Sequence, residues 1–265
     1  MDSNEERYVV FSDLHGRAGL LEACYKRYGD SVTYISGGDA IDAPEHGNVK
    51  ETIDLLQNIG ALCLYGNHEW VLGAAMHNPD EYSRKVWSYT WSGYHRGVLG
   101  SYGLQEPSSV KSYKDFDYMS AALELKDAIA GAGHMQFFDN LKPYFETDDF
   151  IVVHGGLTHA VWDGKRGQRL ELDVVGQTPK SATRTRRQWD AEPVQIFDPH
   201  YTLSTRLELP HGPAKKVITG HAHSSESSIS RVTDNGKRIR LAGTVSLGMP
   251  LYVYESWTGG VVPIH

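Results

Sequence analysis

Asp13 and His15 stand two residues apart in the stretch Asp-Leu-His-Gly-Arg, which follows the apolar run Tyr8–Phe11. Carboxylate and imidazole groups are both metal ligands. In an extended chain, side chains two residues apart project to the same side, so this pair could hold one cation while Leu14 turns toward the core. The triplet alone is a weak signal, because most Asp-x-His triplets are ordinary turns.

The same sequence pattern recurs along the chain. Each time, a short apolar run ends in a turn that contains Gly and Asp, Asn or His. Open α/β sheets build their sites beyond the carboxyl ends of strands. Glycine allows the sharp bend and the close approach of a ligand. The repeated turns therefore predict one shared pocket. The further units are 32–42, 61–69, 150–156 and 215–223.

The side chains in these turns offer carboxylate, imidazole and amide donors but no thiolate. This set suits Mn, Fe or Zn better than a cysteine-rich structural zinc site. About seven or eight such ligands are too many for one ion, and they suit two ions bridged by one carboxylate. A pair of ions of this kind stabilises the attacking and leaving oxygens when a phosphoryl group is transferred to water.

The order Asp-x-His-Gly, Gly-Asp-x-x-Asp, Gly-Asn-His-Glu, His-Gly-Gly, Gly-His resembles the calcineurin-like metallophosphoesterases. Within them the chain is most similar to the phosphoprotein phosphatase branch, which includes bacterial and phage Ser/Thr phosphatases and symmetrical diadenosine tetraphosphatases. Residues 101–103 and 134–157 extend the resemblance to nearly the whole chain. It implies an α/β fold, a β-sandwich of two mixed sheets flanked by helices (α/β/β/α) with a helical insertion.

The resemblance also implies which residues hold the ions. One carboxylate is expected to bridge two divalent cations, with Mn²⁺ as the first choice and Fe or Zn as alternatives. A hydroxide between the two ions is the expected nucleophile. The implied ligands are Asp13, His15 and Asp39 for the first ion, and Asp39, Asn67, His154 and His221 for the second.

His68 is expected to have a different role, because it directly follows the ligand Asn67. In an extended chain it would point away from that ligand, toward the leaving group. In the family, the matching histidine protonates or orients the leaving oxygen, and an Asp at the position of Asp42 holds the imidazole. An anionic partner favours imidazolium, which is the form that a general acid needs.

Two positions depart from the family pattern. The phosphate-binding Arg that usually follows the second Asp of Gly-Asp-x-x-Asp is Ala43 here, followed by Pro44. The other departure is His223, since phosphoprotein phosphatases usually have Gly-His-Thr. In the wider superfamily, which has Gly-His-x-His, the second His ligates the first ion, so His223 is a predicted ligand.

Another guanidinium could replace the missing clamp, because it can bind two phosphate oxygens at once. A solvated loop explains the basic cluster at 184–187 equally well, and the sequence does not decide. The candidates are Arg17, Arg184, Arg186 and Arg187.

The 265 residues contain no Pro/Gly/Ser-rich linker, so we expect one domain, 1–265. Strands alternate with helices at 18–28 and 49–59, which predicts a parallel sheet. Residues from about 70 to 148 lack this rhythm and predict a helical insertion that caps the pocket, with a helix at 118–130. Expected C-terminal strands, antiparallel members of a second sheet, are 238–241, 251–255 and 260–264.

Composition predicts a cytoplasmic protein. Hydrophobic residues make up 40% of the chain, yet no apolar stretch approaches the roughly 20 residues of a membrane span. The polar start, Met1–Arg7, argues against a secretory signal. Cys24 and Cys63 lie in apolar surroundings and are expected to be buried free thiols. The net charge of −7 disfavours nucleic acid as a partner.

The leading functional hypothesis is a phosphomonoesterase like the Ser/Thr protein phosphatases, which would act on a phosphorylated protein or a small phosphoester. The alternative is a dinucleoside polyphosphate hydrolase of the diadenosine tetraphosphate type, or a nucleotide phosphodiesterase. An inactive binding module is the least favoured, because every expected ligand and the acid are present. The sequence does not choose between the first two.

Overall fold

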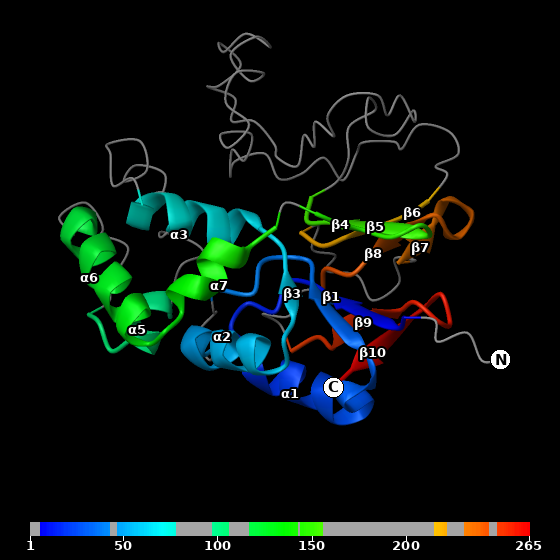
Figure 1. Ribbon diagram of the computed structural model, residues 1–265, viewed down its shortest axis with the longest axis horizontal. Helices are drawn as coiled ribbons and strands as arrows, with labels where there is room; N and C mark the ends of the chain where they lie inside the picture. The colour runs from blue at the N-terminus through cyan, green and yellow to red at the C-terminus, as the bar shows by residue number, and fades with distance from the viewer. Residues whose placement is uncertain are drawn as a thin grey trace, which may run out of the picture.

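The protein is built from two five-stranded β-sheets and a set of helices (Figure 1). The computed structural model describes residues 6–42, 47–77, 97–105, 117–142, 144–155, 215–221, 231–243 and 248–265. In these parts of the chain the α-helices are α1 (Ala18–Tyr28), α2 (Val49–Asn58), α3 (Asn67–His77), α5 (Val98–Ser101), α6 (Tyr118–Gly131) and α7 (Met135–Asn140).

The first sheet combines N-terminal and C-terminal strands. Its members are β1 (Tyr8–Phe11), β2 (Thr33–Ser36), β3 (Leu62–Cys63), β9 (Leu251–Glu255) and β10 (Gly260–Ile264). They lie in the order β10-β9-β1-β2-β3. β1, β2 and β3 are parallel, whereas β9 is antiparallel to both β1 and β10. The carboxyl ends of the three parallel strands therefore meet at one edge.

The second sheet packs against the first. Its members are β4 (Phe145–Glu146), β5 (Phe150–Val153), β6 (Lys216–Thr219), β7 (Val232–Thr233) and β8 (Arg238–Arg240). Their order is β4-β5-β6-β8-β7, with β5, β6 and β8 parallel and the two edge strands antiparallel. The predicted sandwich of two mixed sheets flanked by helices is confirmed.

Apolar side chains on both faces of the strands build two apolar layers. In β1, Val9 and Phe11 pack with α1 and α2, whereas Val10 packs toward the second sheet. Successive side chains of a strand point to opposite faces, so one strand serves both layers. The layer between the sheets includes Ile35 of β2 and Ile218 of β6. Figure 1 shows α1 and α2 covering the outer face of the first sheet.

Most of the predicted elements are confirmed. The helices expected at 18–28, 49–59 and 118–130 are α1, α2 and α6, each with ends within one residue of the prediction. Sheet membership at the C-terminus was predicted wrongly. β9 and β10 are antiparallel but belong to the first sheet, because β9 pairs with β1. β8 does belong to the second sheet, although it runs parallel to β6.

Helices α5 and α7 are tied to α2 by a buried histidine. His134, 1% exposed, lies at the start of α7 between the Tyr102 hydroxyl (Nδ1, 2.7 Å) and Asp54 Oδ1 (Nε2, 2.8 Å). The Ser101 hydroxyl also accepts from the Val49 amide at the start of α2. These bonds join α5 and α7, two of the described helices of the expected insertion, to the helical layer of the first sheet.

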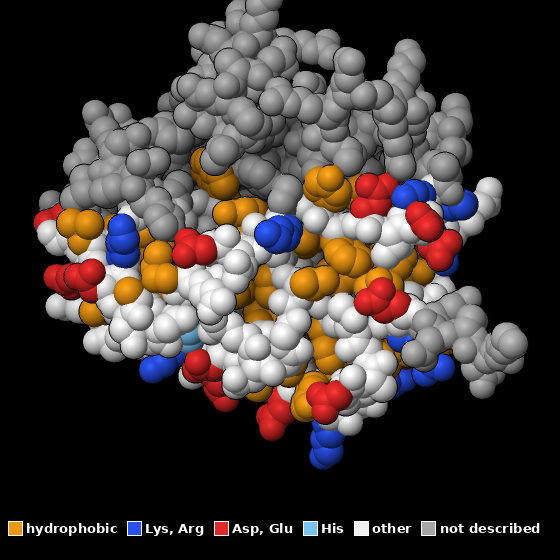
Figure 2. All heavy atoms as spheres, viewed as in Figure 1, with side chains coloured by type: hydrophobic (Ala, Val, Ile, Leu, Met, Phe, Trp, Pro, Cys, Tyr) orange, Lys and Arg blue, Asp and Glu red, His pale blue; other side chains and the backbone are white. Residues whose placement is uncertain are grey.

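The described surface carries mixed charge. Lys and Arg side chains are interspersed with Asp and Glu on the face seen in Figure 2. Cys24 and Cys63 are free, with Cys24 fully buried and Cys63 half-buried. Among the described helices, none is long and apolar enough to cross a membrane.

Candidate active site

The candidate ligands follow parallel strands of both sheets. β1, β2 and β3 lead into the turns at Asp13, Asp39 and Asn67, and β5 and β6 lead to His154 and His221. Hydrogen bonds join the turns of one sheet to those of the other, as the His221 amide donates to the Asp13 carboxylate (2.9 Å) and His154 Nδ1 donates to the carbonyl at position 37 (2.9 Å). The carboxyl ends of the two sheets thus meet at one place.

These turns have an unusual backbone. Six non-glycine residues in the described part of the chain have positive φ, a region that is sparsely populated by residues with a Cβ. Strain of this kind concentrates at functional sites. Five of the six are candidate site residues: Asp13 (58°), His15 (47°), Asp39 (54°), Asp42 (69°) and His221 (63°).

The extended conformation expected for Asp13 and His15 is therefore wrong. A left-handed turn, not a strand, carries both side chains, because the chain reverses directly after β1. Leu14 between them is nevertheless fully buried, as predicted.

One tight group of donors surrounds His154 Nε2. This atom lies 3.1 Å from Asp39 Oδ2, 3.1 Å from Asn67 Oδ1 and 3.1 Å from His221 Nδ1. The Asn67 oxygen lies 3.0 Å from His221 Nδ1. Ligand bonds of about 2.0–2.2 Å place neighbouring donors about 3 Å apart around an ion. The spacing therefore fits one cation.

The Asn67 side chain belongs to this group, because its amide lies 3.0–3.2 Å from His154 Nε2, His221 Nδ1 and both Asp39 oxygens. With its oxygen toward these atoms, Asn67 would be one more donor to a cation. Turned by 180°, the amide would instead donate hydrogen bonds to them.

Backbone carbonyls fix the tautomers of two histidines. Nδ1 of His154 lies 2.9 Å from the Gly37 carbonyl, and Nδ1 of His15 lies 3.2 Å from the Ile41 carbonyl. A carbonyl only accepts, so each Nδ1 carries the proton and donates it. When the imidazole is neutral, as binding a metal requires, each Nε2 then presents a lone pair.

A second group of donors shares Asp39. Ligand atoms of His15, Asp39 and His68 lie within 4.8 Å of one another, as do those of Asp39, His154 and His221. Asp13 Oδ1 lies 3.9 Å from His15 Nε2, and both Asp13 oxygens accept from the His221 amide (3.0 and 2.9 Å). By distance alone, His68 belongs to this second group more closely than Asp13 does.

His68 is held by Asp42, since its Nδ1 hydrogen-bonds Asp42 Oδ2. Its Nε2 lies 3.7 Å from Asp39 Oδ2. The expected extended geometry is wrong, because Asn67 and His68 begin α3. Successive helical residues differ by about 100° around the axis, so the two side chains still diverge.

Buried charges shift the pKa of the central groups. Burial alone would lower the pKa of His68, but the Asp39 and Asp42 carboxylates outweigh it and raise the pKa to about 10. Burial likewise opposes, and Asp39 favours, protonation of His154, whose pKa rises to about 9. Although burial favours its neutral form, the His154 and His68 charges hold the pKa of Asp39 well below its usual range. The metal-free site thus holds carboxylates against imidazolium groups.

Two residues in this region had no predicted role. Glu69 is fully buried, and burial together with the Asp39 charge raises its pKa to about 7. Arg231 donates to the Ala242 carbonyl (2.7 Å), and its guanidinium lies 3.3 Å from the Tyr252 ring centroid. No motif points to Arg231. The sequence signal for Glu69 is its place at the end of the Gly-Asn-His-Glu motif, which gave it no role.

The phosphate-binding candidates are only partly described. Arg17 begins α1 directly beyond the first turn, and its Nε is buried without a hydrogen-bond partner in the described part of the chain. Burial lowers the pKa of Arg17. The other positions lie outside the described residues: Ala43, Arg184, Arg186, Arg187 and His223.

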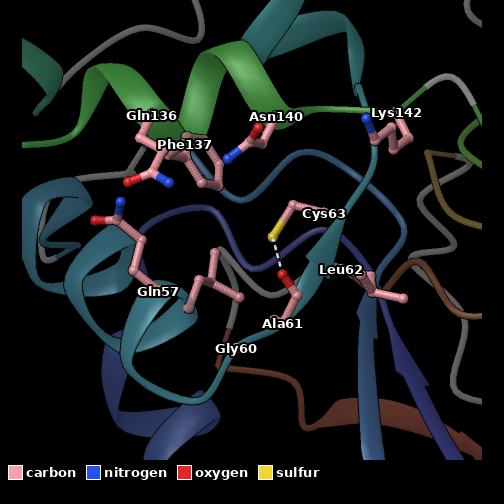
Figure 3. A pocket seen from close by; sticks show the side chains of 10 residues that line it. Gln57, Gly60, Ala61, Leu62, Cys63, Gln136, Phe137, Asn140 and Lys142 are labelled. Carbon is pink, nitrogen blue, oxygen red and sulfur yellow. Dashed lines mark hydrogen bonds between the residues drawn. The ribbon is translucent and has the colours of Figure 1, made fainter.

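A cavity of about 380 Å³ lies elsewhere, between α2, β3 and α7 (Figure 3). Leu56 and Phe137 contribute apolar surface, and Gln57, Gln136 and Asn140 contribute amides. None of the candidate ligands lines it.

Comparisons with known proteins agree with this geometry. The family model for calcineurin-like phosphoesterases matches residues 6–225. No curated protein matches the chain by sequence. Among solved structures, a candidate diadenosine tetraphosphatase shares 15% identity at a TM-score of 0.52, over 98% of this chain and 93% of that one. A cold-active protein-tyrosine phosphatase of a psychrophilic Shewanella species shares 14% at 0.51, over 98% and 80%.

At such low identity these structures bear on the fold alone. The fold and the family match together define a metallophosphoesterase, an enzyme that hydrolyses phosphoric esters. The chain belongs to the calcineurin-like phosphoesterase family, whose members depend on metal ions.

Two glycines make room for the ligand side chains. A Cβ on Gly220 would overlap the Ser12 hydroxyl and Asp13 Oδ2, and a Cβ on Gly66 would overlap Asp39. Neither glycine has positive φ, so the requirement is for space and not for backbone freedom.

Gly220→Ala should therefore displace the Asp13 carboxylate and weaken Mn²⁺ binding by about tenfold or more, as changes around metal ligands typically do. Titration calorimetry of the demetallated protein measures this. Gly19→Ala is the matched control, because a Cβ at Gly19 meets no atom within 4 Å. Equal affinity of both variants for Mn²⁺ would show that Asp13 takes no part in metal binding.

Proposed function

We propose that the protein is a phosphomonoesterase with the chemistry of the Ser/Thr protein phosphatases, acting through two divalent cations that share Asp39. The observation that carries this proposal is the position of Asp39 in both donor groups. His15 and Asp13 would complete the first site. Asn67, His154 and His221 would complete the second.

The cations supply two kinds of chemistry when bound. They lower the pKa of a water molecule and stabilise negative charge on the phosphoryl oxygens. The donors fit such ions because they are neutral imidazoles, carboxylates and one amide oxygen, all of which must be unprotonated at the ligating atom to bind. Mn²⁺ is the proposed ion, because mixed nitrogen and oxygen donors suit it better than Mg²⁺.

His68 would supply the proton. As a water oxygen bonds to phosphorus, the bond from phosphorus to the leaving oxygen breaks, and that oxygen takes a proton from His68 Nε2. Asp42 holds the other ring nitrogen, so Nε2 is the atom left to act. The Asp39 and Asp42 charges favour the protonated imidazole that this step needs.

A dinucleoside polyphosphate hydrolase is the second candidate. Among the solved structures compared, the candidate diadenosine tetraphosphatase matches over nearly the full length of both chains, although at 15% identity this bears on the fold alone. The sequence also has alanine at position 43 in place of the family's phosphate-binding Arg, and the loss of this clamp would suit a bulkier group beside the phosphate. The same metals and the same acid would serve anhydride cleavage.

Substrate comparison distinguishes the two candidates. The proposed phosphomonoesterase should hydrolyse a phosphopeptide and a small aryl phosphate at least about tenfold faster, in kcat/KM, than a dinucleoside tetraphosphate. Each activity should disappear with a chelator and return with Mn²⁺ better than with Mg²⁺. The reverse order of substrates would favour the second candidate, and full activity in exhaustively demetallated protein would reject both.

His68→Asn should lower turnover on alkyl phosphates by about 10² to 10⁴, the usual contribution of a positioned proton donor, while leaving metal content unchanged. The loss should shrink on aryl phosphates with acidic phenols, because such leaving groups need little protonation. His265→Asn, at the exposed C-terminus, is the control. Equal losses on both substrate types would contradict the acid role.

Arg17→Ala should raise KM for a monoester and lower kcat/KM by about tenfold or more, because a charge-assisted bidentate contact contributes about 1.5–3 kcal/mol. Arg27→Ala on the same helix, half-exposed and paired with Glu255, should have little effect. If Arg17→Ala has normal kinetics, the same assay on single Ala variants identifies which other arginine is critical. The arginines to compare are Arg184, Arg186 and Arg187. Normal kinetics in every variant would leave phosphate binding to the metals.

A further inference from the structure

Glu69 makes an unusually complete set of hydrogen bonds. Its Oε2 accepts from the Asp39 amide (2.9 Å) and the Gly66 amide (2.9 Å). Its Oε1 accepts from the Ala40 amide (2.7 Å) and the Ile41 amide (3.1 Å). The side chain comes from the first turn of α3 and is fully buried. One carboxylate thus joins the turns that follow β2 and β3.

Only a carboxylate can fill this position. An ionised carboxylate offers acceptor sites on both oxygens and no competing N–H, whereas a glutamine amide would turn an NH₂ toward two of the four amides. Burying another negative charge beside Asp39 is costly by itself. The four hydrogen bonds from backbone amides offset part of that cost, so the number of acceptor atoms, and not packing alone, specifies a carboxylate here.

The bonds set the shape of the loop that carries the shared ligand. Residues 39–41 turn their consecutive amides onto Glu69, while the Asp39 carboxylate itself lies against His154 and His68. Asp39 adopts a φ of 54° there, a conformation that needs support from its surroundings. Glu69 is the group that supplies this support at the Asp39 amide itself.

We propose that Glu69 is a positioning residue that fixes the loop 39–41 in its ligand-presenting shape before any cation binds. The inference rests on the proposed metal site but not on the identity of the substrate. Glu69 would touch neither substrate nor metal. It would act through Asp39, and through the backbone that continues to Asp42.

Amide hydrogen exchange in the metal-free wild-type protein is the first test. The amides of Gly66, Asp39, Ala40 and Ile41 should be protected even after exhaustive chelation, because their acceptor belongs to the protein. Fast exchange of these four amides, with slowing only on addition of Mn²⁺, would overturn the proposal. This measurement needs no variant, so it decides even if a Glu69 variant does not fold.

Glu69→Gln is the second test, since it keeps the shape and removes the acceptors. The four amides should exchange at least about tenfold faster, and Mn²⁺ affinity by calorimetry should fall by about tenfold to a hundredfold, the usual effect of losing a group that orients a ligand. Glu22→Gln, on the exposed side of α1, should change neither. A lower melting temperature with unchanged exchange and unchanged Mn²⁺ affinity would show a merely structural role.

Neither readout depends on phosphate hydrolysis. If the wild-type protein proves inactive on phosphomonoesters while Glu69→Gln still loosens the loop and weakens Mn²⁺ binding, the proposed function fails and the role of Glu69 stands. If the wild-type protein is active and the variant keeps its exchange rates and metal affinity, the role of Glu69 fails and the proposed function stands.

Discussion

Four carboxylates, each at most 1% exposed, are buried together where the carboxyl ends of the two sheets meet: Asp13, Asp39, Asp42 and Glu69. Buried charge is costly unless opposite charge or hydrogen bonds accompany it. Here imidazoles and backbone amides provide part of that compensation, and a cation bound beside Asp39 would provide more. The glycines and the left-handed turns of the site hold these groups close together in spite of their mutual repulsion.

Crowding of the ligand side chains at this junction explains which residues and backbone conformations the turns contain. Glycines occur where a Cβ would meet a ligand side chain, as at Gly66 and Gly220. Left-handed backbone occurs where a turn must present its side chain directly after a strand, as at Asp39. The two-layered core allows this, because the parallel strands are buried on both faces and hold the turns from behind. Strain in the turns is thus offset by packing in the strands.

Local pattern was enough to predict most elements and the candidate residues. An apolar run followed by Gly with Asp or His is a short-range signal, so the units at Asp13 and His154 could be recognised without knowing the fold. Long-range pairing is not encoded in this way, which is why β9 was assigned to the wrong sheet. The conformation of the Asp13 turn was missed because a sequence does not distinguish extended from left-handed chain there. Glu69 ends the Gly-Asn-His-Glu motif, but its role was missed because its partners are backbone amides, which carry no residue signature.

The most direct test of the central claim, that Asp39 is shared by two cations, is a crystal structure of the Mn²⁺-loaded protein with anomalous data at the manganese edge. Two anomalous peaks about 3.5–4 Å apart are predicted. Asp39 should lie within bonding distance of both, with His15 on one side and His154 on the other. A single peak, or two peaks of which only one contacts Asp39, would contradict the account.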